Sequence, residues 1–386
     1  MRVAVFKGQS QYDVLRFFSE KIAMGFTQLG CEVDIIDLLC EDWQTHLISS
    51  VRKGLNAVIA PNGVACDLKN AEGNSFFDTN GIRYIGLFVD HPSFHLNRIM
   101  SAPKNSIFTF IDKSHLDFAK TYLNKYGTIH YFLPHGGSLT DNARLERKKN
   151  FLFSGSFKSI TLDDVRLKNY PFLLSSLLTN TYEEMVSEPH TNFHQVFENV
   201  LQHSNIYFAQ EHIRLKIMSK IFIDINLIRC SSNRINMLNA FENNGLKVDI
   251  CGPSSWEEYC SDKRFMNYRG QKSYREILQL YSQYKFVLND NNDFFSGSHE
   301  RHFDALQNGA CPISPINEYY SSGAHACGIG MFYDRYNIDE SIAELVDTDT
   351  NYEAFQDGLK LFSDEQRLQQ SWLYRVAELI NLLELE

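Results

Sequence analysis

The segment 2–38 reads RVAVFKGQSQYDVLRFFSEKIAMGFTQLGCEVDIIDLL, which predicts a strand, a helix and a second strand. Its first apolar run ends at Gly8, and apolar residues then recur at helical spacing as far as Gly30. Glycine is typical of the position just beyond the last turn of a helix. A second apolar run, residues 31–38, completes the unit, and strand–helix–strand units of this kind are typical of parallel sheets.

The alternation continues through the first 150 residues. Further strands are predicted at residues 57–60, 83–89, 106–111 and 128–133. In a doubly wound parallel sheet the carboxyl ends of the strands meet at one rim, and ligands bind there. The residues that this arrangement places on the rim are Gly8, Asn62, Asp90, His91 and His135.

A second α/β region follows the charged stretch 141–150, DNARLERKKN, which predicts a domain junction near residue 150. A glycine-free stretch at about 162–230 predicts a helical insertion, and a new helix is predicted to begin at about residue 233. We therefore predict an α/β protein with two Rossmann-like halves. The predicted division is 1–150, 151–350 with the insertion, and C-terminal helices at 351–386.

Composition excludes several classes of protein. The chain has 386 residues, of which 44% are apolar, so it is expected to fold rather than to be disordered. A formal charge of −10 argues against a general nucleic-acid or anionic-membrane surface and leaves room for a local basic cleft, and no nucleic-acid partner is predicted. No signal peptide and no integral membrane segment is predicted, and the eight cysteines form no C-x-x-C pair. These features predict a cytoplasmic protein with reduced thiols.

The strongest chemical motif is residues 296–310, SGSHERHFDALQNGA. A Gly/Ser turn leads into the N-terminus of a helix, where free N–H groups and the helix dipole favour an anion such as a diphosphate. Arg301 in the first turn adds a possible contact to a phosphate oxygen, and Asp304 offers a carboxylate to ribose hydroxyls. The alternative is that Glu300 and Asp304 only favour the helix N-terminus and pair with Arg301. The preceding residues 290–293, DNND, are expected to form a solvated loop.

The order of segments in the second half carries a resemblance. The segments are FLFSGSFK (151–158), RINMLNAFENNGLKVDICGP (234–253), the Arg269-Gly270 turn, a capped helix (273–284), FVLND (286–290) and HERHFDALQNGACPIS (299–314). This order resembles the C-terminal half of group 1 glycosyltransferases of the GT-B fold, especially the CgeB-like, spore-maturation branch. That branch usually has R-x-F-E-A-L-A-x-G where this chain has RHFDALQNG from Arg301 to Gly309. Asp90-His91-Pro92 similarly looks like the acidic-proline turn of the branch.

The resemblance implies a GT-B fold with a central cleft, in which the second half holds a nucleotide-diphosphate sugar and the first half receives the acceptor. Carried over by position, Arg301 faces the diphosphate, Asp304 the ribose, and the Arg269-Gly270 turn the base, with Gly252 at the cleft edge. Asp304 is one methylene shorter than the usual Glu, and Ser296 replaces the first Glu of an E-x7-E pattern. The implied donor-binding residues are Gly155, Gly252, Arg269, Gly270, Ser298, His299, Arg301 and Asp304.

Transfer to a hydroxyl calls for a base in inverting enzymes, and Asp90 and His91 are the candidates on the acceptor side. His135, in the PHGG segment, is the next candidate. The alternatives are that Asp90 caps the following turn, that His91 only precedes Pro92, and that His135 is a surface turn residue. His91 and His95 are spaced i, i+4, but no third ligand suggests itself, so no metal site is predicted.

The sequence thus predicts a cytoplasmic glycosyltransferase that uses a nucleotide-diphosphate sugar as co-substrate, without metal or other cofactor. Its acceptor is not identified by the sequence. Two alternatives remain: a GT-B nucleotide-sugar epimerase, and a non-catalytic protein that binds a sugar nucleotide as a scaffold.

Overall fold

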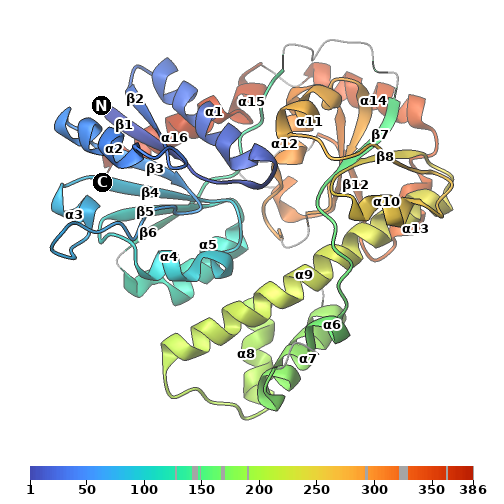
Figure 1. Cartoon of the computed structure of the whole chain (residues 1–386). Coiled ribbons are helices and arrows are strands. Elements are labelled where there is room, and N and C mark those ends of the chain that lie inside the picture. The colour runs from blue at the N-terminus through green and yellow to red at the C-terminus, as the bar shows by residue number, and fades with distance from the viewer. Residues whose placement is uncertain are drawn as a thin grey trace.

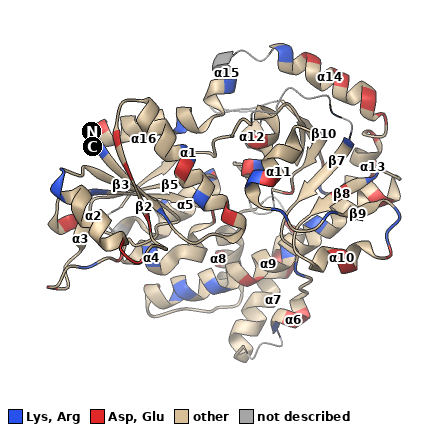
Figure 2. Cartoon of the chain, turned by 45° about the horizontal axis from the view of Figure 1, so that its top comes forward, with Lys and Arg blue, Asp and Glu red and all other residues tan. Residues whose placement is uncertain are grey.

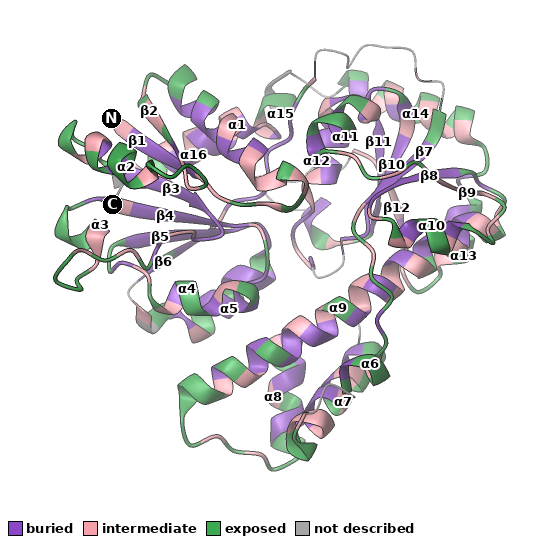
Figure 3. Cartoon of the chain, viewed as in Figure 1, coloured by how far each residue is buried: buried purple, intermediate pink, exposed green. Residues whose placement is uncertain are grey.

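The computed structural model describes residues 1–126, 128–140, 147, 149–166, 170–188, 191–291, 294–320, 329–361 and 364–385. The chain forms two α/β halves, each built on a six-stranded parallel sheet (Figure 1). The strands of both sheets are mostly buried, while exposed residues gather on helices and loops around them (Figure 3). The predicted fold class, α/β with two Rossmann-like halves, is confirmed.

The first sheet has the strand order β2-β1-β3-β4-β5-β6. Its strands are β1 (Arg2–Lys7), β2 (Glu32–Asp37), β3 (Ala57–Pro61), β4 (Arg83–Phe88), β5 (Ser106–Phe110) and β6 (Ile129–Phe132). The helices of this half are α1 (Val14–Gln28), α2 (Trp43–Arg52), α3 (Phe76–Thr79), α4 (Leu96–Met100) and α5 (Lys113–Tyr122), with 3-10 turns η1 (Gln11–Asp13), η2 (Pro92–His95) and η3 (Asn124–Tyr126). The strand order reverses between β1 and β3, and ligands of such sheets bind beyond the carboxyl ends at that point.

The second sheet has the order β12-β11-β10-β7-β8-β9, which reverses between β7 and β10. Its strands are β7 (Lys149–Ser154), β8 (Val248–Cys251), β9 (Met266–Tyr268), β10 (Tyr284–Leu288), β11 (Cys311–Pro315) and β12 (Met331–Tyr333). The later helices are α10 (Ser255–Cys260), α11 (Tyr274–Tyr281), α12 (Glu300–Gln307), α13 (Ile338–Ala343), α14 (Thr348–Leu361), α15 (Asp364–Gln369) and α16 (Trp372–Leu385), with the 3-10 turn η4 (Glu318–Tyr320).

The helical insertion consists of α6 (Leu162–Arg166), α7 (Phe172–Ser187), α8 (Phe193–His203) and the start of α9 (Glu211–Asn243). The expected break between an insertion ending at about 230 and a new helix at about 233 is wrong, because α9 is one helix of 33 residues. The stretch 211–243 holds no glycine or proline to interrupt it, and buried residues recur along its length. The single helix α9 therefore joins the insertion to the second half.

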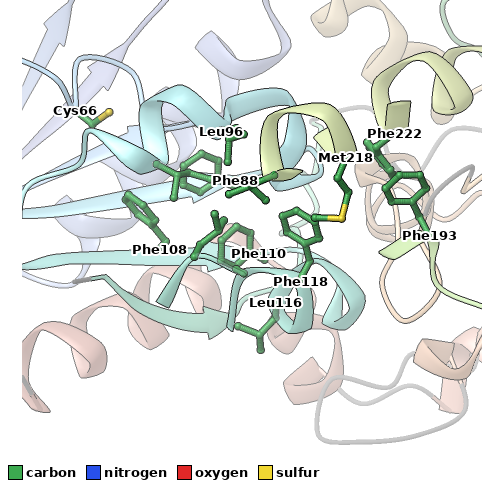
Figure 4. Packing of buried hydrophobic residues seen from close by; sticks show 14 of the residues in the cluster. Cys66, Phe88, Leu96, Phe108, Phe110, Leu116, Phe118, Phe193, Met218 and Phe222 are labelled. Atoms are coloured by element: carbon green, nitrogen blue, oxygen red, sulfur yellow. The ribbon is translucent and has the colours of Figure 1, made fainter. Parts of the chain in front are cut away.

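The insertion packs against the first half, although it belongs to the second half in sequence. Phe193, Met218 and Phe222 of the insertion lie beside Phe118 of α5 in a shared apolar cluster (Figure 4). The ring of Phe222 also stacks on that of His91, with centroids 3.8 Å apart. Helix α9 thus contacts the acceptor-side turn predicted at Asp90-His91 and runs from there into the second half (Figure 1).

The chain crosses between the halves at a hinge that begins at His135 and again at the start of α16. A Cβ on Gly136 would lie 2.5 Å from the backbone nitrogen of Trp372, and one on Gly137 would lie 2.6 Å from the carbonyl oxygen of Phe303. Only glycine permits this close approach of the hinge to α16 and α12. Helix α16 then packs on α1 of the first half. Most of the predicted junction at 141–150 lies outside the described residues.

Candidate functional site

A cavity of about 460 Å³ lies between the two halves, beside the carboxyl ends of strands from both sheets. Six residues predicted from the sequence line it: Asp90, His135, Gly155, Gly252, His299 and Arg301. Five predicted residues are not part of the lining: His91, Arg269, Gly270, Ser298 and Asp304. The structure therefore brings together candidates from both halves, which are up to about two hundred residues apart in sequence.

Two arginines of the second half meet at one buried carboxylate. Arg301 Nη1 lies 2.7 Å from Asp290 Oδ1, and Arg234 Nε lies 2.7 Å from Asp290 Oδ2. Burial works to raise the pKa of Asp290, but the charges of Arg234 and Arg301 outweigh it and hold the pKa far below its usual value. Both arginines line the cavity. The two guanidinium groups bring N–H donors and positive charge to this wall, where they can pair with an anionic ligand.

The expectation of a solvated loop at 290–293 is wrong for its first two residues. Asp290 and Asn291 are buried, because the arginine pair neutralises the carboxylate and Asn291 hydrogen-bonds within the protein. Asn292 and Asp293 lie outside the described residues.

Two further features add to the positive wall. Lys272 lines the cavity and has no hydrogen bond or ion pair within the described ranges. Helix α12 begins after His299, whose side chain makes no capping hydrogen bond, and the backbone N–H of His302 donates to the carbonyl oxygen of His299. Among the described residues, the N–H groups of Glu300 and Arg301 in the first turn are left for a ligand. The wall is completed by the turns after β7 and β8, where a Cβ on Gly252 would lie 2.3 Å from the carbonyl oxygen of Gly155. Glycine at position 252 therefore permits the close approach of these two turns.

Asp90 stands on the opposite wall, after β4 of the first half. Its Oδ2 accepts a hydrogen bond from Asn62 Nδ2 at 2.8 Å and lies 3.3 Å from His95 Nε2. Half of the side-chain surface, 50%, is accessible. Surrounding protein works to raise the pKa of Asp90, but the hydrogen bonds that His95 and Asn62 donate to its charged form outweigh it and lower the pKa. Asp90 is therefore an ionised carboxylate at neutral pH, open to the cavity.

His135 lines the same cavity from the hinge. Its ring packs against Phe18 and Trp372, at centroid distances of 5.4 and 6.1 Å, and its carbonyl oxygen accepts from Arg375 Nε at 3.1 Å. Burial lowers the pKa of His135 to about 4, so the imidazole is neutral at pH 7. Its Nδ1 has no hydrogen-bond partner in the described structure. The ring is buried rather than on a surface turn.

His299 and Glu300 form a second ionic pair in the cavity, with 2.6 Å between His299 Nδ1 and Glu300 Oε2. Burial works to raise the pKa of Glu300, but His299 and Arg301 outweigh it and lower the pKa. The charge of His299 also helps to lower the pKa of Asp90 across the cleft. Titratable groups of the two walls therefore lie within electrostatic reach of each other.

His91 points away from the cavity. It is buried, its Nδ1 accepts from the backbone nitrogen of Ser93 at 3.1 Å, and its ring stacks on Phe222. Burial, with the charges of His115 and His194, lowers the pKa of His91 well below its ordinary value. The sequence did not show that the insertion would dock here, and this docking is what buries the ring.

Asp304 is fully buried beneath α12, outside the cavity. Its Oδ1 accepts from the backbone nitrogen of Ser138 at 2.8 Å, and its Oδ2 accepts from the hydroxyl of Tyr274. Burial raises the pKa of Asp304 well above its ordinary value. Both oxygens are thus used inside the protein, where they tie α12 to the hinge.

The three other predicted residues outside the lining also make their contacts within the protein. Ser298 is buried, with its hydroxyl 2.8 Å from that of Tyr320. Arg269 Nε lies 3.0 Å from Asp249 Oδ1, and the carbonyl oxygen of Gly270 accepts from the nitrogen of Gly252 at 3.3 Å. Arg269 and Gly270 therefore support the turn that carries Gly252.

A strained loop forms another part of the cavity wall. Residues 9–12 line it between β1 and α1, and Tyr12 and Asp13 both adopt left-handed backbone angles, with φ of 55° and 62°. Such angles cost roughly 1–2 kcal/mol for residues other than glycine, and they cluster at functional sites.

Replacing Asp13 tests this strain without changing the cavity lining. Its side chain is 73% exposed and makes no capping bond, so we expect Asp13→Gly to be more stable than Asp13→Ala. Both variants lose the same side chain, and only alanine keeps the Cβ that strains the backbone. Thermal unfolding measures the difference, and an alanine variant that melts at the same or a higher temperature would contradict the strained geometry.

Sequence reasoning missed four residues of the site. Arg234 was quoted within a resembling segment but given no role, and Glu300 was treated only as a residue that favours a helix N-terminus. Tyr12 carried no signal, because it stands in no motif. The one usable hint for Lys272 was its place directly before the capping box at Ser273.

The described residues contain neither a metal-binding cluster nor a membrane-spanning helix. No group of three or more His, Cys, Asp or Glu side chains is placed there to hold a metal ion. Within the same ranges, no helix has the length and apolar character needed to cross a bilayer. The cysteines that are described are free thiols.

No family model and no curated protein matches the chain. Among solved structures it is similar to an alpha-glucosyltransferase in complex with UDP-glucose and DNA containing an abasic site, with 10% identity, a TM-score of 0.54 and 99% of each chain covered. It is also similar to sucrose-phosphate synthase from Thermosynechococcus elongatus, with 8% identity, a TM-score of 0.51, and 99% of this chain and 98% of that one covered. At such identities the likeness establishes the fold, and the chain has the two-domain GT-B fold.

Proposed function

We propose that the protein is a glycosyltransferase that moves a sugar from a nucleotide-diphosphate donor to an acceptor hydroxyl. The observation that carries the proposal is the arginine pair Arg234–Arg301 on one wall of the interdomain cavity, opposite the ionised Asp90 on the other. The structural neighbours support the same class, since one is described as an alpha-glucosyltransferase bound to UDP-glucose. Membership in the CgeB-like branch and a cytoplasmic location remain part of this proposal.

The proposed chemistry follows from the charges of the two walls. Arg234, Arg301 and Lys272 hold the diphosphate, and they stabilise the negative charge that grows on it as the bond to the anomeric carbon breaks. The acceptor oxygen bonds to the anomeric carbon, and Asp90 takes the acceptor proton. His135 is neutral at pH 7 and is the second candidate for that proton.

The direct test is product analysis with a panel of nucleotide sugars, starting with UDP-glucose. A transferase releases the nucleoside diphosphate faster when a suitable acceptor is added, and it yields a glycosylated product by mass spectrometry. An epimerase changes the sugar without releasing it, and a scaffold binds the donor and leaves it unchanged. Either of the last two results would overturn the proposal.

We propose no nucleic-acid partner for this chain, although some neighbours were solved with DNA. The formal charge is −10, and basic and acidic side chains are interspersed over the molecule rather than gathered by sign (Figure 2). Nucleic-acid binding relies on concentrated positive charge. A gel-shift titration with duplex DNA at low salt is expected to show no complex.

Activity is expected to survive removal of divalent metals. Three cationic side chains, Arg234, Arg301 and Lys272, supply at the diphosphate the positive charge that a metal ion supplies in other transferases. The measurement is the transfer rate after dialysis against EDTA. A complete loss that manganese or magnesium restores would contradict the assignment of the diphosphate to these side chains.

A further inference from the structure

We propose that His95 is a positioning residue that holds Asp90 in the orientation needed to accept the proton of the acceptor. This inference rests on the proposed function, because it assigns a partner to the base of that reaction. It also concerns a residue that the sequence considered only as half of an i, i+4 histidine pair.

Among the described residues, the side-chain hydrogen bonds of Asp90 reach one of its two oxygens. Asn62 Nδ2 and His95 Nε2 both lie within hydrogen-bond distance of Asp90 Oδ2, at 2.8 and 3.3 Å. Asn62 is held in turn, since its Oδ1 accepts from the backbone nitrogen of Val89 at 3.0 Å. Two donors on Oδ2 fix the carboxylate plane and leave Oδ1 as the oxygen for an acceptor hydroxyl.

The tautomer of His95 follows from its other neighbour. Arg98 Nη1 lies 3.4 Å from His95 Nδ1, and it also donates to the carbonyl oxygen of Asn62 at 2.9 Å. A guanidinium can only donate, so Nδ1 is the accepting nitrogen and the ring hydrogen sits on Nε2, toward Asp90. The chain of donors therefore runs from Arg98 through His95 to Asp90.

The position of His95 is itself fixed by packing. Its side chain is only 14% exposed, and its ring lies 5.6 Å from that of Phe88, the last residue of β4. It does not line the cavity, whereas Asp90 does. His95 thus acts on the reaction only through Asp90. The other charged or titratable groups that act on Asp90 are His299 and His135 from the facing elements.

The test compares His95→Leu with His95→Gln, whose amide keeps a donor near the position of Nε2. Because small misplacements of a catalytic group cost up to about 10²-fold in rate, we expect His95→Leu to lower kcat by about 10–100-fold. Donor KM should be unchanged, and the acid limb of the pH–rate profile should move to higher pH because Asp90 loses a donor to its charged form. His95→Gln should restore most of the rate. His46→Gln, which alters an exposed His–Asp pair with Asp42 on α2, is the matched control.

A second readout does not depend on transfer. A carboxyl ¹³C NMR titration should show a higher pKa for Asp90 in His95→Leu than in the wild-type protein or His95→Gln. Wild-type kcat, pH profile and Asp90 titration in folded His95→Leu would overturn the inference. Equal losses in both variants together with a raised donor KM would also overturn it, since they mark a general structural role. If Asp90→Asn keeps full activity, the assignment of the base fails instead.

Discussion

Replacing Arg234 or Arg301 with alanine is expected to weaken nucleoside diphosphate binding by about 10–100-fold, the worth of one charge-assisted hydrogen bond. Each variant removes one of two positive charges that share the Asp290 carboxylate. With one arginine left, Asp290 stays paired, so each single variant should remain folded with some loss of stability. Removing both would leave a buried carboxylate without compensation, which is strongly destabilising. The single variants are therefore the informative ones.

Calorimetric titration with a nucleoside diphosphate measures the effect, after thermal unfolding has shown that each variant is folded. Arg275→Ala is the matched control, because Arg275 is 63% exposed, pairs with Glu20 and is not part of the cavity lining. Its affinity should equal that of the wild-type protein. Unchanged affinity in both Arg234→Ala and Arg301→Ala would remove the diphosphate from this wall.

Asp90→Asn is expected to lower kcat by about 10²–10⁴-fold, the usual contribution of a general base. The amide keeps the size of the side chain, but it is uncharged and too weakly basic to accept the proton of the acceptor. Donor affinity should barely change, because the cationic residues stand on the opposite wall. The pKa of Asp90 is lowered, so the wild-type rate should fall only as the pH drops through that low pKa, where the carboxylate becomes protonated.

Steady-state kinetics with donor-binding calorimetry separates the outcomes. Asp42→Asn is the control, because Asp42 is an exposed carboxylate directly before α2 and is not part of the cavity lining. A near-normal kcat in Asp90→Asn would shift the base to His135. Lost donor binding would show that Asp90 helps to hold the donor, and the division of roles between the two walls would be wrong.

Local patterns predicted the fold well, because strand–helix alternation and glycine caps depend on neighbours in sequence. They also located α12 with Arg301 in its first turn. The pairing of Arg301 and Arg234 through Asp290 was out of reach, because it joins three segments across more than sixty residues and depends on the packing of α9. A run of polar residues such as 290–293 predicts a solvent-exposed loop unless the residues that pair with it are known.

The resemblance indicated the kind of site better than it indicated the role of each residue. Asp304 occupies the place of the acidic residue in the resembling motif, yet it faces the hinge, where Ser138 and Tyr274 use both of its oxygens. The sequence made His91 a candidate base and His95 only its i, i+4 partner. Phe222 of the insertion stacks on His91, and His95 is the histidine that lies beside Asp90. Long-range packing of this kind leaves no periodic trace in a single sequence.

The central claim is that the cavity between the halves binds the diphosphate of a nucleotide sugar. Calorimetric titration of the wild-type protein with nucleoside diphosphates, their sugars and the matching monophosphates tests it most directly. We expect one-to-one binding of at least one diphosphate, about tenfold or more tighter than its monophosphate, since the second phosphate gains a further charge-assisted contact. Binding by no member of the panel, or equal binding of monophosphate and diphosphate, would contradict it.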